Sequence, residues 1–190
     1  LVQIGWEVRV LAGGVPSSGL VSGPQPPQVV GVEPVDEIAP AELAALLDGG
    51  KAVVIDLADS RTYRKAHIPG AVWGVRSRLA KVLAAAGGTG TIVLTASDDA
   101  LARLAAADAR ALTDRPVRVL AGGTPAWRLA GLKLAEGRER MADETDDVAL
   151  RPYDRDDGIE DAMREYLSWE VELVRQIERE GTVRFRAVPA

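Results

Sequence analysis

The side chains able to do chemistry in this sequence are few, and most of them stand in one short segment. Ser97, Asp98 and Asp99 follow the apolar run 91–95 and offer one hydroxyl and two carboxylates. A serine becomes a nucleophile only when a base takes its proton, and the chain's single histidine, His67, is not a sequence neighbour. The residue types therefore favour a structural role, in which the two carboxylates cap and stabilise the start of a helix by about 0.3–1 kcal/mol each.

Catalysis by a thiol is excluded in this chain, because its 190 residues include no cysteine. The same absence rules out disulfides and zinc–thiolate sites. One histidine leaves little for a transition metal. We therefore expect neither a metal nor a cofactor.

The charge balance argues against nucleic acid and membranes as partners. The net charge is −5 and the 23 basic residues are scattered, whereas both partners select clustered lysine and arginine. No apolar stretch approaches the roughly 18–20 residues that span a bilayer. The chain begins Leu1-Val2-Gln3, without a methionine or the layout of a signal peptide, so we expect a cytoplasmic piece of a longer protein.

Strands and helices alternate through the middle of the chain. Pro40 suits a first helical turn and Gly49 a helix end, while short, continuous apolar runs indicate strands buried on both faces. The sequence predicts helices at 39–49, 78–86, 98–112 and 125–129, and strands at 52–57, 91–95 and 117–120. This order predicts an α/β fold, an open parallel sheet with helices on both faces.

An internal repeat indicates the domain organisation. The nine residues Val8–Pro16 recur as Val117–Pro125, with eight identities and a shared Gly-Gly. A spacing of 109 residues is about one domain. We therefore interpret residues 1–21 as the tail of a preceding copy, 22–36 as a proline- and glycine-rich linker, and 37–136 as a complete copy.

The two ends of the chain differ from the middle. We expect residues 1 to about 20 to pack as a fragment against the main domain or a second molecule, since they would otherwise expose a strand edge. Residues 137–190 form an acidic segment and a helical extension, with 143–147 expected to be solvated. Apolar residues three or four apart between Ile159 and Glu180 predict one long amphipathic helix that packs on its own domain or a neighbour.

Two segments together resemble a known family. The first, within residues 54–71, contains Tyr63-x-x-x-His67-Ile68-Pro69-Gly70-Ala71, and the second is Leu120-Ala121-Gly122-Gly123-Thr124-Pro125-Ala126-Trp127. They resemble the amino-terminal signature and the closing Gly-Gly motif of the rhodaneses, sulfurtransferases that carry sulfur as a cysteine persulfide. The resemblance covers residues 37–136, and the leading copy of the Gly-Gly motif fits one repeat of a tandem, multi-domain rhodanese.

The motif residues are expected to be structural. Pro69 and Gly70 suit a turn, and we expect the side chain of His67 to fix that turn through a backbone hydrogen bond. Asp56 ends a strand and is expected to cap or pair locally, while Ala58 stands where the family often has arginine. The complete structural set is Asp56, His67, Pro69, Gly70, Gly122, Gly123 and Trp127.

The resemblance places Ala96 where the family has its nucleophilic cysteine. The degenerate loop that it implies consists of Ala96, Ser97, Asp98, Asp99, Ala100, Leu101 and Ala102. An engineered replacement of cysteine would explain Ala96 alone, but not Asp98 and Asp99, since active members usually offer arginine and glycine in this loop. A cysteine restored at position 96 is expected to face backbone amides and to accept sulfur weakly, hindered by the two carboxylates.

Three functions follow as alternatives. The first is a catalytically silent rhodanese-like domain of a multi-domain thiosulfate sulfurtransferase, which supports sulfur transfer on another repeat. Its partners would be the neighbouring repeats, with a homo-oligomer left open. The second is a non-catalytic interaction or regulatory module, and the third is an enzyme with altered chemistry at the same loop.

Overall fold

The protein was analysed as a computed structural model, which describes residues 2, 5–16, 18–20, 22–23, 29–155 and 157–182. The chain divides into two compact units. One consists of residues 27–149, and the other combines residues 1–26 with residues 150–190.

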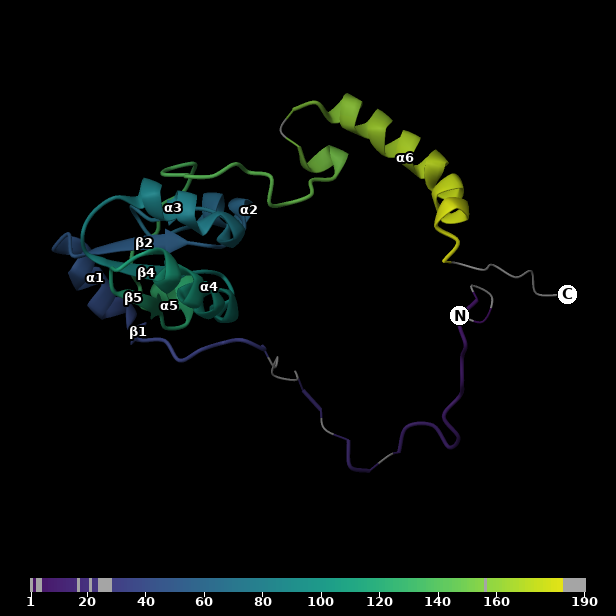
Figure 1. Ribbon diagram of the computed structural model, residues 1–190, viewed down its shortest axis with the longest axis horizontal. Coiled ribbons are helices and arrows are strands. Elements are labelled where there is room, and N and C mark those ends of the chain that lie inside the picture. The colour runs from purple at the N-terminus through teal and green to yellow at the C-terminus, as the bar shows by residue number, and fades with distance from the viewer. Residues whose placement is uncertain are drawn as a thin grey trace, which may run out of the picture. The chain divides into compact units, whose positions relative to one another are not determined.

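A five-stranded, all-parallel sheet forms the centre of unit 27–149 (Figure 1). Its strands are β1 (Glu37–Ile38), β2 (Ala52–Asp56), β3 (Val72–Trp73), β4 (Thr91–Thr95) and β5 (Val117–Leu120), in the order β1-β5-β4-β2-β3. The three predicted strands are confirmed as β2, β4 and β5, the central members. The two edge strands, β1 and β3, have two residues each and were not predicted.

The helices cover both faces of the sheet, as expected. They are α1 (Pro40–Asp48), α2 (Ser60–Lys65), α3 (Leu79–Ala86), α4 (Asp99–Leu112) and α5 (Gly123–Leu129), with a 3-10 turn, η2, at Arg76–Arg78. On one face, α3 and α4 bury Val82 and Ala105 against Leu94. On the other, α1 and α5 bury Leu43 and Trp127 with Val93. Each central strand is therefore apolar on both sides, which explains its continuous apolar run.

Helix α2 was not predicted. It has six residues, too few to show a helical period. Its start is nevertheless capped, because the side chain of Asp59 accepts a hydrogen bond from the backbone N–H of Thr62 at 2.9 Å. The helix brings Tyr63 into the core, where the ring is fully buried.

The acidic segment 143–147 was expected to be solvated, and this is confirmed for residues 144–147, which are exposed, but not for the side chain of Asp143, which is buried. Residues 135–147 form a strap along the domain, which covers the open edge of β3. The N–H of Trp73 donates to the carbonyl of Arg140 at 3.1 Å, and the N–H of Ala142 donates back to Trp73 at 3.0 Å. Because an unpaired edge strand invites pairing with other chains, this cover protects the sheet.

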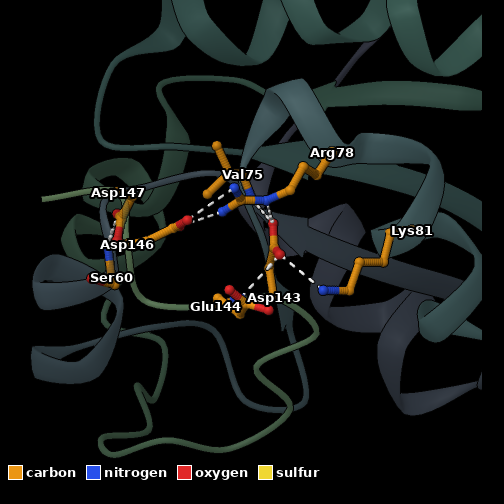
Figure 2. Close-up of polar contacts among 8 residues, drawn as sticks. All are labelled: Ser60, Val75, Arg78, Lys81, Asp143, Glu144, Asp146 and Asp147. Carbon is orange, nitrogen blue, oxygen red and sulfur yellow. Dashed lines mark hydrogen bonds and ion pairs between the residues drawn. The ribbon is translucent and has the colours of Figure 1, made fainter.

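Asp143 is the anchor of the strap (Figure 2). Its side chain is fully buried and accepts from Arg78 Nε at 2.5 Å and Lys81 Nζ at 3.1 Å. Asp146 also binds Arg78, and Asp147 accepts from the N–H of Ser60 at 2.7 Å, at the start of α2. Burial raises the pKa of Asp143, but the hydrogen bonds, led by that from Arg78, outweigh it and hold the pKa at about 2. The carboxylate is therefore ionised at neutral pH.

We expect Asp143→Ala to destabilise the domain by about 2 kcal/mol, because it removes charge-assisted hydrogen bonds from a buried site. Asp146→Ala is the matched control, since this carboxylate binds the same arginine from an exposed position and its loss should change little. Urea unfolding at pH 7 measures both. The Asp143 contribution is complete above pH 3.8 and is lost as the pH falls towards 2, so the two variants should converge in acid. Equal losses for both at pH 7 would contradict the anchoring role.

The second unit contains the predicted long helix, confirmed as α6 (Ile159–Glu180), preceded by a 3-10 turn, η3 (Pro152–Asp154). Ala162, in the first turn of α6, is buried, and so is Pro152. Within the described ranges, no helix is both long and apolar enough to cross a bilayer.

The strand expected near the N-terminus does not form. Residues 6–11 carry no strand pairing, and the side chains of Val10 and Leu11 are 92% and 69% exposed. The packing of this fragment against the main domain or a second molecule stays a prediction.

Candidate functional site

Ala96 directly follows β4 and is fully buried. Side chains alternate along a strand, so Ala96 shares a face with Ile92 and Leu94 and joins the core beneath α3 and α4. The expectation that a side chain at position 96 faces the backbone amides of the following loop stays a prediction, and the structure adds that Ala96 has no exposed surface. The methyl group points into the core, on the face that α4 covers.

The predicted loop 96–102 is shorter in the structure. Helix α4 begins at Asp99, so only Ser97 and Asp98 separate Ala96 from the helix, and residues 99–102 form its first turn. Asp98 is the N-cap and accepts from the N–H of Ala100 at 2.9 Å. Asp99 accepts from Arg103 Nε at 2.6 Å. The helix start is therefore occupied by the chain's own carboxylates, which disfavour an anionic ligand there.

The hydroxyl of Ser97 is not activated by the chain's histidine. Ser97 is exposed, whereas His67 is fully buried and stacks on the ring of Tyr63, with centroids 3.9 Å apart. The Nδ1 atom of His67 lies 2.8 Å from the carbonyl oxygen of Tyr63. The imidazole therefore interacts with the last turn of α2 inside the core, and it cannot serve as a base for an exposed serine.

The turn around Pro69 and Gly70, which His67 was expected to fix, is bound by the side chain of Tyr63 instead. The N–H of Ala71 donates to the carbonyl of Ile68 at 3.0 Å, and Gly70 has φ +76°, a conformation that glycine adopts without strain. The phenol of Tyr63 donates to the carbonyl of Ala71 at 2.8 Å. The side chain of His67 instead bonds within its own helix end, and its backbone pairs with Ala135 of the strap.

The Gly-Gly motif brings α5 against position 96. Gly122 and Gly123 have φ +70° and +61°, and a Cβ atom on Gly123 would collide with the carbonyl oxygen of Ala96. Only glycine permits this approach. Trp127, one turn later, is buried and donates through Nε1 to the carbonyl of Lys133 at 2.8 Å. The motif therefore keeps its structural role where the nucleophile is missing.

A buried polar cluster lies beside this junction; the sequence analysis named Asp56 but not its association with Thr95 and Thr124. Asp56 and Thr95 are paired in register at the ends of β2 and β4, and Thr95 shares a hydrogen bond of 3.0 Å with Thr124 of α5. Asp56 accepts from the N–H of Ala58 at 2.9 Å and from Thr124 at 3.5 Å. Burial raises the pKa of Asp56 to about 6, although both hydrogen bonds oppose it. The sequence signal for this cluster was that two neighbouring parallel strands each end on a polar residue, Asp56 in β2 and Thr95 in β4.

Comparison with known proteins agrees with this scaffold. The family model described as the rhodanese-like domain matches residues 39–130. The crystal structure of thiosulfate sulfurtransferase from Pseudomonas aeruginosa is similar over 99% of this chain, with 37% identity and a TM-score of 0.87. The chain spans 36% of that protein's length.

Two further solved structures are similar over part of the chain. A rhodanese-related protein from Thermoplasma volcanium has 14% identity and a TM-score of 0.47, covering 53% of this chain and 97% of its own. The rhodanese-like domain of an Anabaena protein has 24% identity and a TM-score of 0.47, covering 60% and 89%. No curated protein matches the chain.

Proposed function

The chain contains a rhodanese-like domain related to thiosulfate sulfurtransferase, and we propose that it is a catalytically silent repeat of a multi-domain sulfurtransferase. In this proposal, sulfur is carried by a cysteine of another repeat. The present domain supports that repeat without binding or transferring sulfur itself.

The observation that carries the proposal is the identity and burial of the residue at position 96. The chain has no cysteine, and Ala96, which the resemblance aligns with the family's nucleophile, is buried. The surrounding scaffold is intact, because Gly122 and Gly123 still seat α5 against this residue. A fold retained with its reactive group removed fits a supporting role better than a new reaction, since the adjacent Asp98 and Asp99 are engaged in capping and in an ion pair.

The similarity to a longer protein supports the multi-domain part. Nearly the whole chain, including segments outside residues 39–130, is similar to about a third of the Pseudomonas aeruginosa thiosulfate sulfurtransferase. The repeated nine residues at 8–16 and 117–125 fit the end of one domain preceding another. These two observations together support the tandem arrangement.

We expect the 190-residue chain to form no thiocyanate from thiosulfate and cyanide above a buffer blank, because it has no thiol. A longer polypeptide that includes the adjoining repeats should form thiocyanate, and replacing the loop cysteine of an adjoining repeat by serine should abolish it. Steady-state assays on both proteins at neutral pH make the measurement. Turnover by the short chain, or a longer polypeptide with no active cysteine, would refute the proposal.

The second candidate, a non-catalytic interaction module, is favoured by the exposed apolar side chains of α6. The same assay separates the two. An interaction module has no active repeat beside it, so the longer polypeptide would be inactive as well.

A further inference from the structure

An apolar face runs along α6. Its central line is formed by Ile159, Met163, Tyr166, Leu173 and Ile177, spaced four and three residues apart except where Glu170 intervenes. Most of these side chains are more than a third exposed. A single helix of 22 residues gains little stability in water without packing of its apolar side. Something outside the described contacts is therefore expected to cover this face.

The width of the face indicates the kind of partner. In a two-stranded coiled coil, the positions that flank the central line carry charges. Here Leu167 and Val174 flank it on one side and Trp169 on the other, with exposures of 52%, 64% and 50%. A face this wide fits the broad surface of a folded domain rather than one helix of a second copy.

Glu170 adds a charge requirement. It lies on the central line of the face, and its carboxylate accepts a hydrogen bond from the phenol of Tyr166 at 2.7 Å. A carboxylate covered by a partner is costly unless a cation or further donor meets it. The covering surface is therefore expected to be apolar with a basic side chain opposite Glu170.

Two observations indicate which domain this is. By its contacts, the segment 150–190 belongs with residues 1–26 and not with the domain 27–149. Residues 8–16 repeat the end of the domain, and their Val10 and Leu11 are also exposed. We propose that α6 docks through its apolar face on the preceding rhodanese-like copy of the same polypeptide. The inference rests on the tandem arrangement proposed above.

Hydrogen exchange tests the docking directly. The 190-residue chain is compared with a longer polypeptide that adds the complete preceding copy. Amides within 163–177 should exchange at least tenfold more slowly in the longer polypeptide, because a docked helix opens less often. Leu173→Glu should remove this protection. Ser168→Glu, which adds the same charge on the opposite side of the helix at an exposed position, should keep it. Glu170→Arg should also reduce the protection.

Each other outcome overturns the proposal. Equal exchange in the two proteins means that the preceding copy does not cover α6. Protection in the short chain that grows with protein concentration, together with dimers in sedimentation, assigns the face to a second copy. Protection in the dilute, monomeric short chain assigns it to the chain itself. Thiocyanate formation is measured on the same longer polypeptide. A protein in which α6 is protected but no thiocyanate forms contradicts the proposed function and not the docking. A protein that forms thiocyanate while α6 stays unprotected contradicts the docking and not the proposed function.

Discussion

A cysteine introduced at position 96 is expected to remain unreactive in the folded protein. Ala96 is fully buried in the core beneath α3 and α4, so the new thiol would be enclosed by apolar side chains. Burial disfavours the thiolate and raises the thiol pKa above its usual value of about 8.5. The added sulfur should also destabilise this packed site by roughly 1–3 kcal/mol.

The measurement is the reaction of Ala96→Cys with an aromatic disulfide between pH 6 and 9. We expect a rate at least 100-fold below that of the urea-unfolded protein, since the thiol reacts only when the region opens. Ser97→Cys is the control, because the adjacent side chain is exposed and should react readily. Equal rates for the two variants, with both folded by circular dichroism, would show that Ala96 is accessible.

Altering the neighbouring carboxylates should not rescue sulfur transfer. The sequence alone suggested that arginine and glycine in place of Asp98 and Asp99 would activate a thiol introduced by Ala96→Cys. The structure gives these residues other roles, because Asp98 caps α4 and Asp99 binds Arg103. Replacing the cap should cost about 1 kcal/mol while the thiol stays buried. Persulfide on the triple variant, detected by mass after incubation with thiosulfate, would contradict this.

Asp56→Asn is expected to stabilise the domain at pH 8 by up to about 3 kcal/mol. The folded-state pKa of Asp56 is raised to about 6, whereas its ordinary value is 3.8, so ionising this carboxyl in the core is costly. Asparagine keeps an oxygen for the N–H of Ala58 and supplies an amide donor to Thr124 without the charge. The variant should match the natural protein in stability near pH 4.

The pH dependence has a definite sign. Between pH 3.8 and about 6 the folded state holds the Asp56 proton and the unfolded state does not, so stability falls as pH rises through this window. The free energy of unfolding in urea is measured for Asp56→Asn and for the natural protein at each pH, and the difference between the two gives the contribution of Asp56 ionisation to stability. Asp59→Asn is the contrast, because hydrogen bonds from Thr62 outweigh burial and lower the pKa of Asp59. A difference for Asp56→Asn that does not change with pH would contradict the raised pKa.

The sequence was sufficient for the centre of the fold and insufficient for its edges. β2 and β4 are unbroken apolar runs because both of their faces are covered, and α6 shows a helical period over six turns. β3 has two residues and α2 has six, so neither shows a period. Both elements make long-range contacts, β3 with β2 and the strap and α2 with Asp147, which a local sequence pattern does not show.

The placement of the degenerate loop at residues 96–102 stays a prediction, whereas the burial of Ala96 is an observation of the structure. Ala96 follows Ile92 and Leu94 at a spacing of two, and this alternation already indicated a buried side chain. The strap was missed because its acidic composition is typical of solvated loops. Asp143 meets Arg78 across 65 residues of sequence, a pairing that local composition does not reveal.

The strap also fixes the point from which the chain continues towards α6. Asp147 is bound to the N–H of Ser60, so the chain leaves the domain from a fixed point. Eleven residues separate Asp147 from Ile159, and they include the 3-10 turn η3. Because this connection is covalent, any surface of the same polypeptide that α6 can reach meets the helix at an effective concentration that does not change with dilution. Within a longer polypeptide, contacts made by α6 would then be independent of dilution, and even a surface of weak intrinsic affinity would stay occupied.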